Sequence, residues 1–282
     1  MDDRRRAATV RRPDKTAGTY VRRTLVVVYL FFLIVWPVSL VVQKTFENGL
    51  GNLQTALGDP VVTDALQLTV VVAIWAVAIN TVFGIGISLL LVRYEFRGRG
   101  ILSAVIDLPL SVSPVVVGLA LLLAYGSTNG TFGPALSSAG LQIAFATPGI
   151  VMATAFVSLP LVIREIVPVL HEIGTEQEQA ARSLGAGPWQ TFRRITLPSI
   201  RWALVYGVVL SLARALGEFG AVKVISGNIA QQTQTATLVV EEKYQDFEQG
   251  SAYATSFLLA LIAVAALVVV TILRPKDTDH GD

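Results

Sequence analysis

Six long apolar blocks constrain the fold of this chain more than any other feature. An α-helix needs about 20 residues to cross about 30 Å of hydrocarbon, and most of the blocks reach that length. Charged residues make up only 15% of the 282 positions, less than the roughly 25% typical of soluble domains. The pattern predicts an all-α, polytopic membrane protein with six transmembrane helices. The blocks are 24–42, 65–92, 101–125, 148–163, 202–222 and 251–273.

The fourth and first blocks are the shortest of the six. We expect the fourth helix to begin earlier than its block, near Leu141. The first block resembles a signal peptide at first sight, but its 19 residues exceed the usual apolar run of about 7–15 residues. No small-x-small cleavage pattern follows it. We therefore predict that it is retained as a membrane anchor.

The positions of Lys and Arg predict the orientation, because cytoplasmic loops of membrane proteins collect positive charge. Eighteen of the 22 Lys and Arg residues fall on one side of the six blocks, three fall on the other, and Arg214 lies within the fifth block. This split predicts a multi-pass protein of the bacterial inner (plasma) membrane, with both termini in the cytoplasm.

The apolar blocks and the positions of Lys and Arg divide the chain into four predicted parts. Residues 1–22 form a basic cytoplasmic tail that we expect to be disordered near anionic lipid headgroups. Residues 23–60 hold the first transmembrane helix and an outer loop, 61–275 form the transmembrane core with a cytoplasmic loop at 165–201, and 276–282 form a second cytoplasmic tail.

The loop at 165–201 has clear local signals for two short helices. Thr175 and Glu178 have the spacing of a capping box, which predicts a helix from there to about Leu184. Gly185 stands where a glycine ends a helix.

The second short helix is expected to start at Pro188, since proline is favoured at a first helical position. Trp189, Phe192 and Ile195 then form an apolar stripe that could anchor this helix to the protein, and Leu197-Pro198 is expected to end it before the fifth block.

Small residues are predicted to face outward on the first of these helices. Ala180, Ala181 and Ala186 lie beside Gly185, and small side chains let another backbone approach closely. The residues alone leave two interpretations open in equal measure: a docking surface for another protein, or an interfacial helix on the lipid headgroups.

A family resemblance bears on that choice. Gln179-Ala180-Ala181, three residues, Gly185, nine residues and then Ile195-x-Leu197-Pro198 resembles the EAA loop of binding-protein-dependent ABC importer permeases, except that Gln179 replaces the leading Glu. The resemblance implies the transmembrane domain of a type I ABC importer, with this loop as the coupling helix that seats in an ATPase subunit. The residues expected to form the coupling surface are Gln179, Ala180, Ala181, Leu184, Gly185, Ala186, Ile195, Leu197 and Pro198.

A coupling surface needs an ATPase, and this chain has no P-loop sequence to hold the phosphates of ATP. We therefore expect ATP and Mg²⁺ to bind to a separate partner. For this chain itself we expect no catalytic residue, cofactor, metal or nucleic-acid site. It has no cysteine, and its two histidines have no neighbouring ligands.

Two further stretches resemble the sulfate/thiosulfate permeases. These are Arg-Ser-Leu-Gly-Ala-Gly-Pro-Trp-Gln-Thr-Phe at 182–192, and Ala-Arg-Ala-Leu-Gly-Glu-Phe-Gly-Ala-Val at 213–222 followed by Ser226-Gly227. The sequence Glu-Phe-Gly-Ala-Val is more similar to the W-type subunit than to its T-type partner. The resemblance implies a T-type second permease subunit, two copies of the ATPase and an extracytoplasmic sulfate-binding protein. Molybdate and tungstate permeases share part of this sequence, so molybdate and tungstate are an alternative substrate class.

Three charged residues are expected inside the membrane, where an ionised side chain costs about 2.5–3.5 kcal/mol on insertion scales. Arg214 and Glu218 are four residues apart near the middle of the fifth block, and they are predicted to form either a pore or gate pair or a structural pair that holds neighbouring helices. Asp107 is predicted to be a second buried acid, as a gate residue or a packing partner. Pro109 and Pro114 follow it and predict a kink.

Some features favour simpler roles. Gly84, Gly86 and Ser88 are expected to form a close helix-packing seam. The acidic outer loop 228–249 is expected to be solvated, or alternatively to touch a binding protein. Two other classes remain open: a carrier driven by an ion gradient, and a membrane enzyme, for which Asp107 with Glu218 is the only candidate pair.

Overall fold

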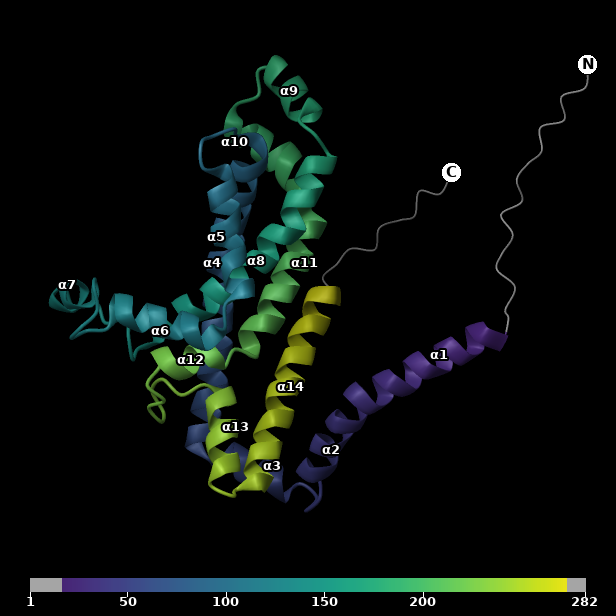
Figure 1. Cartoon of the computed structure of the whole chain (residues 1–282), viewed down its shortest axis with the longest axis vertical. Helices are drawn as coiled ribbons and strands as arrows, with labels where there is room; N and C mark the ends of the chain where they lie inside the picture. Colours follow the sequence, from purple (N-terminus) through teal and green to yellow (C-terminus); the bar gives the residue numbers. More distant parts are fainter. Residues whose placement is uncertain (1–16, 273–282) are drawn as a thin grey trace, which may run out of the picture.

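The computed structural model describes residues 17–272, and this part of the chain contains helices and no strands. Figure 1 shows an elongated bundle with α9 at one end, and with α3 and α13 at the other. The elements are α1 (Ala17–Leu30), η1 (Phe31–Val35), α2 (Trp36–Thr45), α3 (Gly51–Gly58), α4 (Pro60–Arg93), α5 (Arg99–Ser111), α6 (Pro114–Tyr125), α7 (Gly133–Ser138), α8 (Thr147–Glu172), α9 (Glu176–Ser183), α10 (Pro188–Thr191), η2 (Phe192–Thr196), α11 (Leu197–Leu216), α12 (Gly220–Ile225), α13 (Ala236–Gln245) and α14 (Gln249–Ile272).

The predicted membrane spans are present, with one of them sharply bent. Within residues 17–272, five helical stretches are long and apolar enough to cross a membrane, and α5 with α6 adds a sixth if this bent pair is one span. The bend is 116°. Pro109 lies inside α5 and Pro114 opens α6, so the predicted kink is confirmed.

Helices α4, α8 and α11 form the centre of the bundle because glycines let them approach closely. A Cβ on Gly84 of α4 would lie 2.6 Å from Val162 Cγ1 of α8, and one on Gly207 of α11 would lie 2.9 Å from Val162 Cα. The predicted packing seam is thus confirmed at Gly84, and Ser88 is buried too. Gly86 is outside it, since its Cβ would meet no atom within 4 Å.

Helix α8 differs in extent from the predicted fourth span. It begins at Thr147, not near Leu141, because the chain just before it turns sharply at Phe145, with a φ of 58° and its amide bonded to the Ile225 carbonyl. It runs on to Glu172, well into the expected loop. Ile166 and Leu170 explain the extension, since they are buried in the cluster that also contains Ile200 of α11.

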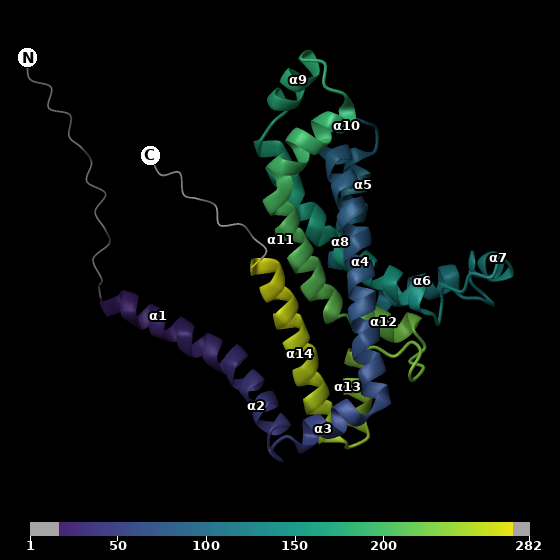
Figure 2. The ribbon, with the colours of Figure 1, turned by 180° about the vertical axis from the view of Figure 1, so that it is seen from behind.

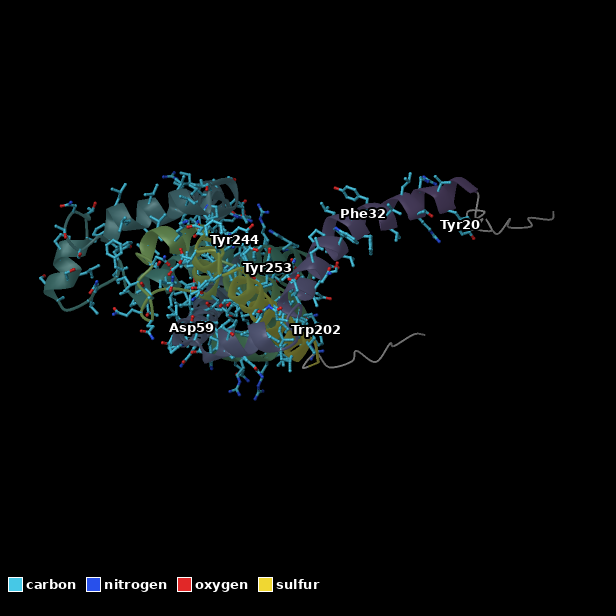
Figure 3. The ribbon with its side chains drawn as sticks, turned by 90° about the horizontal axis from the view of Figure 1, so that it is seen from below. Tyr20, Phe32, Asp59, Trp202, Tyr244 and Tyr253 are labelled. Atoms are coloured by element: carbon cyan, nitrogen blue, oxygen red, sulfur yellow. The ribbon has the colours of Figure 1, made fainter. Side chains whose placement is uncertain are left out.

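The first span stands apart from the others. It runs as one helix over Tyr20–Thr45 and none of its apolar window is buried inside the chain. Figures 1 and 2 show it leaning away from the bundle, and Figure 3 places Tyr20 far from Tyr244 and Tyr253, with Phe32 between them. Its end is attached to the bundle: α2 contacts α14, and Thr45 Oγ1 donates to the Tyr253 carbonyl at 3.1 Å.

The predicted tails lie largely outside the described residues. Residues 1–16 and 273–282 are not described. The first helix begins at Ala17 and so includes the last six residues of the predicted tail 1–22.

Candidate functional site

Helix α9, the first of the two predicted loop helices, ends as its sequence indicates. Gly185 has a φ of +85°, its amide bonds to the Arg182 carbonyl at 2.9 Å, and the Ala186 amide bonds to the Ala181 carbonyl at 3.0 Å. This pair of bonds is the Schellman motif, which satisfies the last carbonyls of a helix. The predicted role of Gly185 in ending the helix is confirmed.

The predicted capping box at the start of α9 is wrong. Thr175 is the N-cap residue, but its side chain caps no backbone amide and instead accepts from Gln179 Nε2 at 2.9 Å. Glu178, the other expected member, turns inward and binds an arginine from another helix. Glu178 therefore pairs with that arginine and does not bond to the N-terminus of its own helix.

The second predicted helix does begin at Pro188, but Leu197-Pro198 does not end it. One continuous helix runs over Pro188–Leu216. Proline lacks the amide needed for an α-helical bond and clashes with the preceding turn. Here the turn Phe192–Thr196 widens into a π-helix, with the Leu197 amide bonded to the Phe192 carbonyl, and the helix continues past the proline.

The coupling surface predicted from the sequence is largely exposed. Leu184 is 89% exposed, and Gln179, Ala180 and Gly185 are exposed beside it. Among the other predicted members, Pro198 is exposed, Ala181, Ala186 and Ile195 are half-buried, and Leu197 packs inward on the cluster of α8 and α11.

The aromatic stripe does not anchor the second helix over its whole length. Phe192 and Ile195 are half-buried, but Trp189 is 71% exposed and contacts the Phe192 ring at 5.5 Å between centroids. The exposed indole of Trp189 enlarges the surface that a partner protein could contact.

Behind α9 lies an ion pair that the sequence patterns did not indicate. Glu178 Oε1 accepts from Arg93 Nε and Nη2, each at 3.2 Å, and from Thr196 Oγ1 at 2.9 Å. Arg93 Nη1 also donates to the Leu170 carbonyl at 3.0 Å. The side chains of Arg93 and Glu178 are only 11% and 10% exposed. The available signal was an arginine that directly follows a long apolar block.

Arg214 and Glu218 do form an ion pair, at a different place in the fold from the one predicted. Helix α11 ends at Leu216, so Glu218 lies in the break before α12 and not in the middle of a span. Arg214 Nη1 lies 2.6 Å from Glu218 Oε2, with the side chains 35% and 2% exposed. Glu218 Oε1 also accepts from the Ala221 amide at 3.0 Å, and the pair therefore brackets the break.

A cavity of about 430 Å³ lies beside that break, between α11, α13 and α14. Gly217, Phe219 and Thr237 are among its lining residues, and Thr237 Oγ1 donates to the Glu218 carbonyl at 2.9 Å. The surroundings of this pair suit a structural bracket and a pore lining alike.

The third predicted charge, Asp107, is not a buried acid. Its side chain is 48% exposed, and its Oδ1 lies 3.0 Å from Nη2 of Arg164 on α8. The continuation of α8 beyond its apolar block provides this partner. Asp107 is thus paired with Arg164, whereas Glu218 is paired with Arg214.

A buried polar residue in the centre of the bundle was also missed. Asn80 of α4 is 1% exposed, and its Nδ2 donates to Ser158 Oγ of α8 at 2.8 Å and to Ser211 Oγ of α11 at 3.2 Å. Polar side chains inside apolar spans often bond across helices in this way. The signal was the single asparagine in the second apolar block.

At the opposite end of the molecule, the acidic segment 228–249, which was predicted to be an outer loop, contains helix α13 and is held by lysines. Lys243 Nζ lies 2.9 Å from Asp59 Oδ2 and 2.8 Å from Glu248 Oε2. Burial alone raises the pKa of Asp59, but hydrogen bonds from Lys243 and the Val61 amide outweigh it and lower this pKa below its usual value. Glu241 pairs with Lys223, so the cluster is only partly the solvated face that was expected.

The comparisons with known proteins agree with this geometry. Residues 80–276 match the model of the family described as binding-protein-dependent transport system inner membrane component. The chain is 45% identical to the sulfate transport system permease protein CysW of Synechocystis sp. over 272 residues. This alignment covers 96% of this chain and 98% of that protein.

Two Escherichia coli K12 proteins are also similar. CysW is 45% identical over 243 residues, covering 86% of this chain and 83% of that protein. The sulfate transport system permease protein CysT is 35% identical over 248 residues, covering 88% and 89%.

Among solved structures, the fold is similar to a chain of a bacterial alginate ABC transporter in complex with an alginate pentasaccharide-bound periplasmic protein. The TM-score is 0.77 at 17% identity, covering 94% of this chain and 96% of that one. A likeness at this identity establishes the fold alone.

Proposed function

The chain belongs to the family of binding-protein-dependent transport system inner membrane components, and on this premise we propose that it is the membrane-spanning permease subunit of an ATP-driven importer of sulfate or thiosulfate. The chain itself would form part of the pore and carry out no ATP hydrolysis. Its partners would be two copies of an ATPase, a T-type second permease subunit and an extracytoplasmic sulfate-binding protein.

The observation that carries the coupling half of this proposal is the exposed end of α9. Leu184, at 89% exposed, and Gly185 with its positive φ form a projecting corner within the motif that marks the coupling helix. A corner of small and apolar residues suits insertion into a cleft of another protein. In this assignment ATP and Mg²⁺ bind to the ATPase partner.

The substrate half is supported by the relatives. The three named above are sulfate permease proteins, of both the W and T kinds, and the W-type is the more similar at 45% against 35%. ATP is a suitable energy source because a dianion moving into a negatively charged cell costs about 4.6 kcal/mol per 100 mV before any concentration gradient. Molybdate or tungstate, also oxyanions, are the alternative cargo.

The orientation is part of the same proposal. The ATPase is cytoplasmic, so α9 would face the cytoplasm, as would both chain termini. The excess of Lys and Arg on the α9 side supports this placement.

A deletion strain tests the cargo directly. We expect loss of growth on sulfate as the sole sulfur source, with growth restored by a reduced sulfur source that bypasses the importer. Molybdenum-dependent enzyme activity should stay normal. Normal growth on sulfate together with loss of molybdenum-dependent activity would instead assign the chain to the alternative cargo.

A further inference from the structure

Helix α9 is attached to the rest of the molecule through a polar contact and not through an apolar core. Glu178 is its only buried residue, and all the others are exposed or half-buried. A helix held by one buried side chain depends on that side chain for its position. The bonds of Glu178 therefore determine how a force applied to α9 reaches the bundle.

Those bonds lead to three transmembrane helices. Arg93 is the last residue of α4, Thr196 belongs to the π-helical turn that leads into α11, and the Leu170 carbonyl lies near the end of α8. Arg93 contacts both Glu178 and that carbonyl. These are the same three helices that pack closely at Val162 and share the Asn80 bonds.

Helix α4 is well suited to carry a displacement further. It has 34 residues, which at about 1.5 Å per residue makes a rod of about 51 Å. Its first residue follows Asp59, which pairs with Lys243 of α13 at the opposite end of the molecule. Figure 2 shows α4 running from the α9 end of the bundle to the α3 end.

A cavity beside the pair leaves space into which α9 could shift. It has a volume of about 340 Å³ and is lined by Arg93, Glu178 and Thr196, together with Gln179 and Arg182 of α9. The two ionic side chains are 11% and 10% exposed, so water weakens their attraction less than it would at the surface.

We propose that the Arg93–Glu178 ion pair is the linkage that transmits movement of α9 to α4, α8 and α11, and that both are positioning residues for coupling. This inference rests on the proposed function, since it concerns the transfer of work from an ATPase. It assigns this role to Glu178 and not to its neighbour Gln179, whose side chain is exposed and bonds only within α9 and its cap.

The test uses the full complex of both permease subunits, the ATPase and the binding protein, reconstituted in proteoliposomes. Sulfate import and ATP hydrolysis are measured separately in Glu178→Gln, Arg93→Met and the double variant. We expect the ATPase to co-purify and hydrolyse ATP, while sulfate imported per ATP falls by about tenfold, within the usual range of coupling between sites. Because the two residues act as one linkage, the double variant should be no worse than either single one.

Glu47→Gln is the matched control. It makes the same Glu-to-Gln change in the exposed Lys44–Glu47 pair at the end of α2, which lies at the end of the bundle opposite α9. An unchanged ratio of sulfate to ATP in the Arg93 and Glu178 variants would overturn the proposal, as would additive losses or loss of the ATPase from the complex. An unmodified complex that lacked the ATPase or imported no sulfate would refute the proposed function itself, whatever the variants did.

Discussion

The two ion pairs Arg93–Glu178 and Arg214–Glu218 show how single residues differ once their surroundings are known. In the first pair both side chains are nearly buried, whereas in the second Glu218 is 2% exposed and Arg214 is 35% exposed. Removing the partner of a buried charge costs more than removing an exposed charge, because the remaining charge stays desolvated. The two members of the second pair should therefore respond unequally to mutation.

We expect Arg214→Ala to destabilise the protein by roughly 2 kcal/mol, below the ~3–5 kcal/mol of a fully buried pair because Arg214 is partly solvated. Glu218→Gln should cost less, since the amide can still accept from the Ala221 amide and Arg214 can reach solvent. Thermal unfolding of the purified chain in detergent measures both. Equal losses would argue against a structural bracket, and lost transport with unchanged stability would favour a pore role for Arg214.

Among the elements, α9 and the helix Pro188–Leu216 meet at a corner of the fold, and two features of the backbone shape that corner. The positive φ of Gly185 ends α9 abruptly, and the π-helical turn at Phe192–Thr196 keeps the next helix unbroken through Pro198. Leu184, just after α9, and Trp189, near the start of the next helix, are both largely exposed. The geometry of this corner, more than any single contact, defines the surface offered to a partner.

Gly185→Leu is expected to lower ATP-driven uptake by about tenfold, within the range of coupling between sites. A Cβ at this position meets no atom of the chain within 4 Å, so the bulk would project toward the ATPase. The backbone strain of a side chain at positive φ is only about 1–2 kcal/mol.

Gly49→Leu is the control for that strain. It has a φ of +64°, is exposed and also has open space at its Cβ, but it lies in the loop between α2 and α3 at the other end. Uptake should stay normal in this variant. Equal loss in both variants, or normal uptake in Gly185→Leu, would contradict a docking role for the corner.

At the scale of the whole molecule, α4 joins the two ends of the bundle, with α9 at one end and the Asp59–Lys243 pair at the other. The first span leans out from this axis and buries none of its apolar window against the chain. Which end faces the cytoplasm decides whether the proposed partners can bind at all.

The absence of cysteine in the chain makes this orientation easy to measure. We expect a membrane-impermeant maleimide added to intact cells to label Phe247→Cys, because Phe247 is 87% exposed between α13 and α14. Leu184→Cys should react only after the membrane is opened, in cells that lack the ATPase. The reverse pattern would place α9 outside and refute the proposed function.

The sequence by itself determined which segments form the apolar spans, because burial in lipid depends on the local sum of apolar residues. It also determined the end of α9, because Gly185 tolerates the turn. The tertiary structure decided which charges are buried and what they bind. Glu178 meets Arg93 from 85 positions away, and Asp107 is half-exposed and pairs with Arg164, which the longer α8 carries. Periodicity places a side chain on a face of its own helix, but only the packing of the helices decides whether that face meets lipid, water or a charge from another part of the chain.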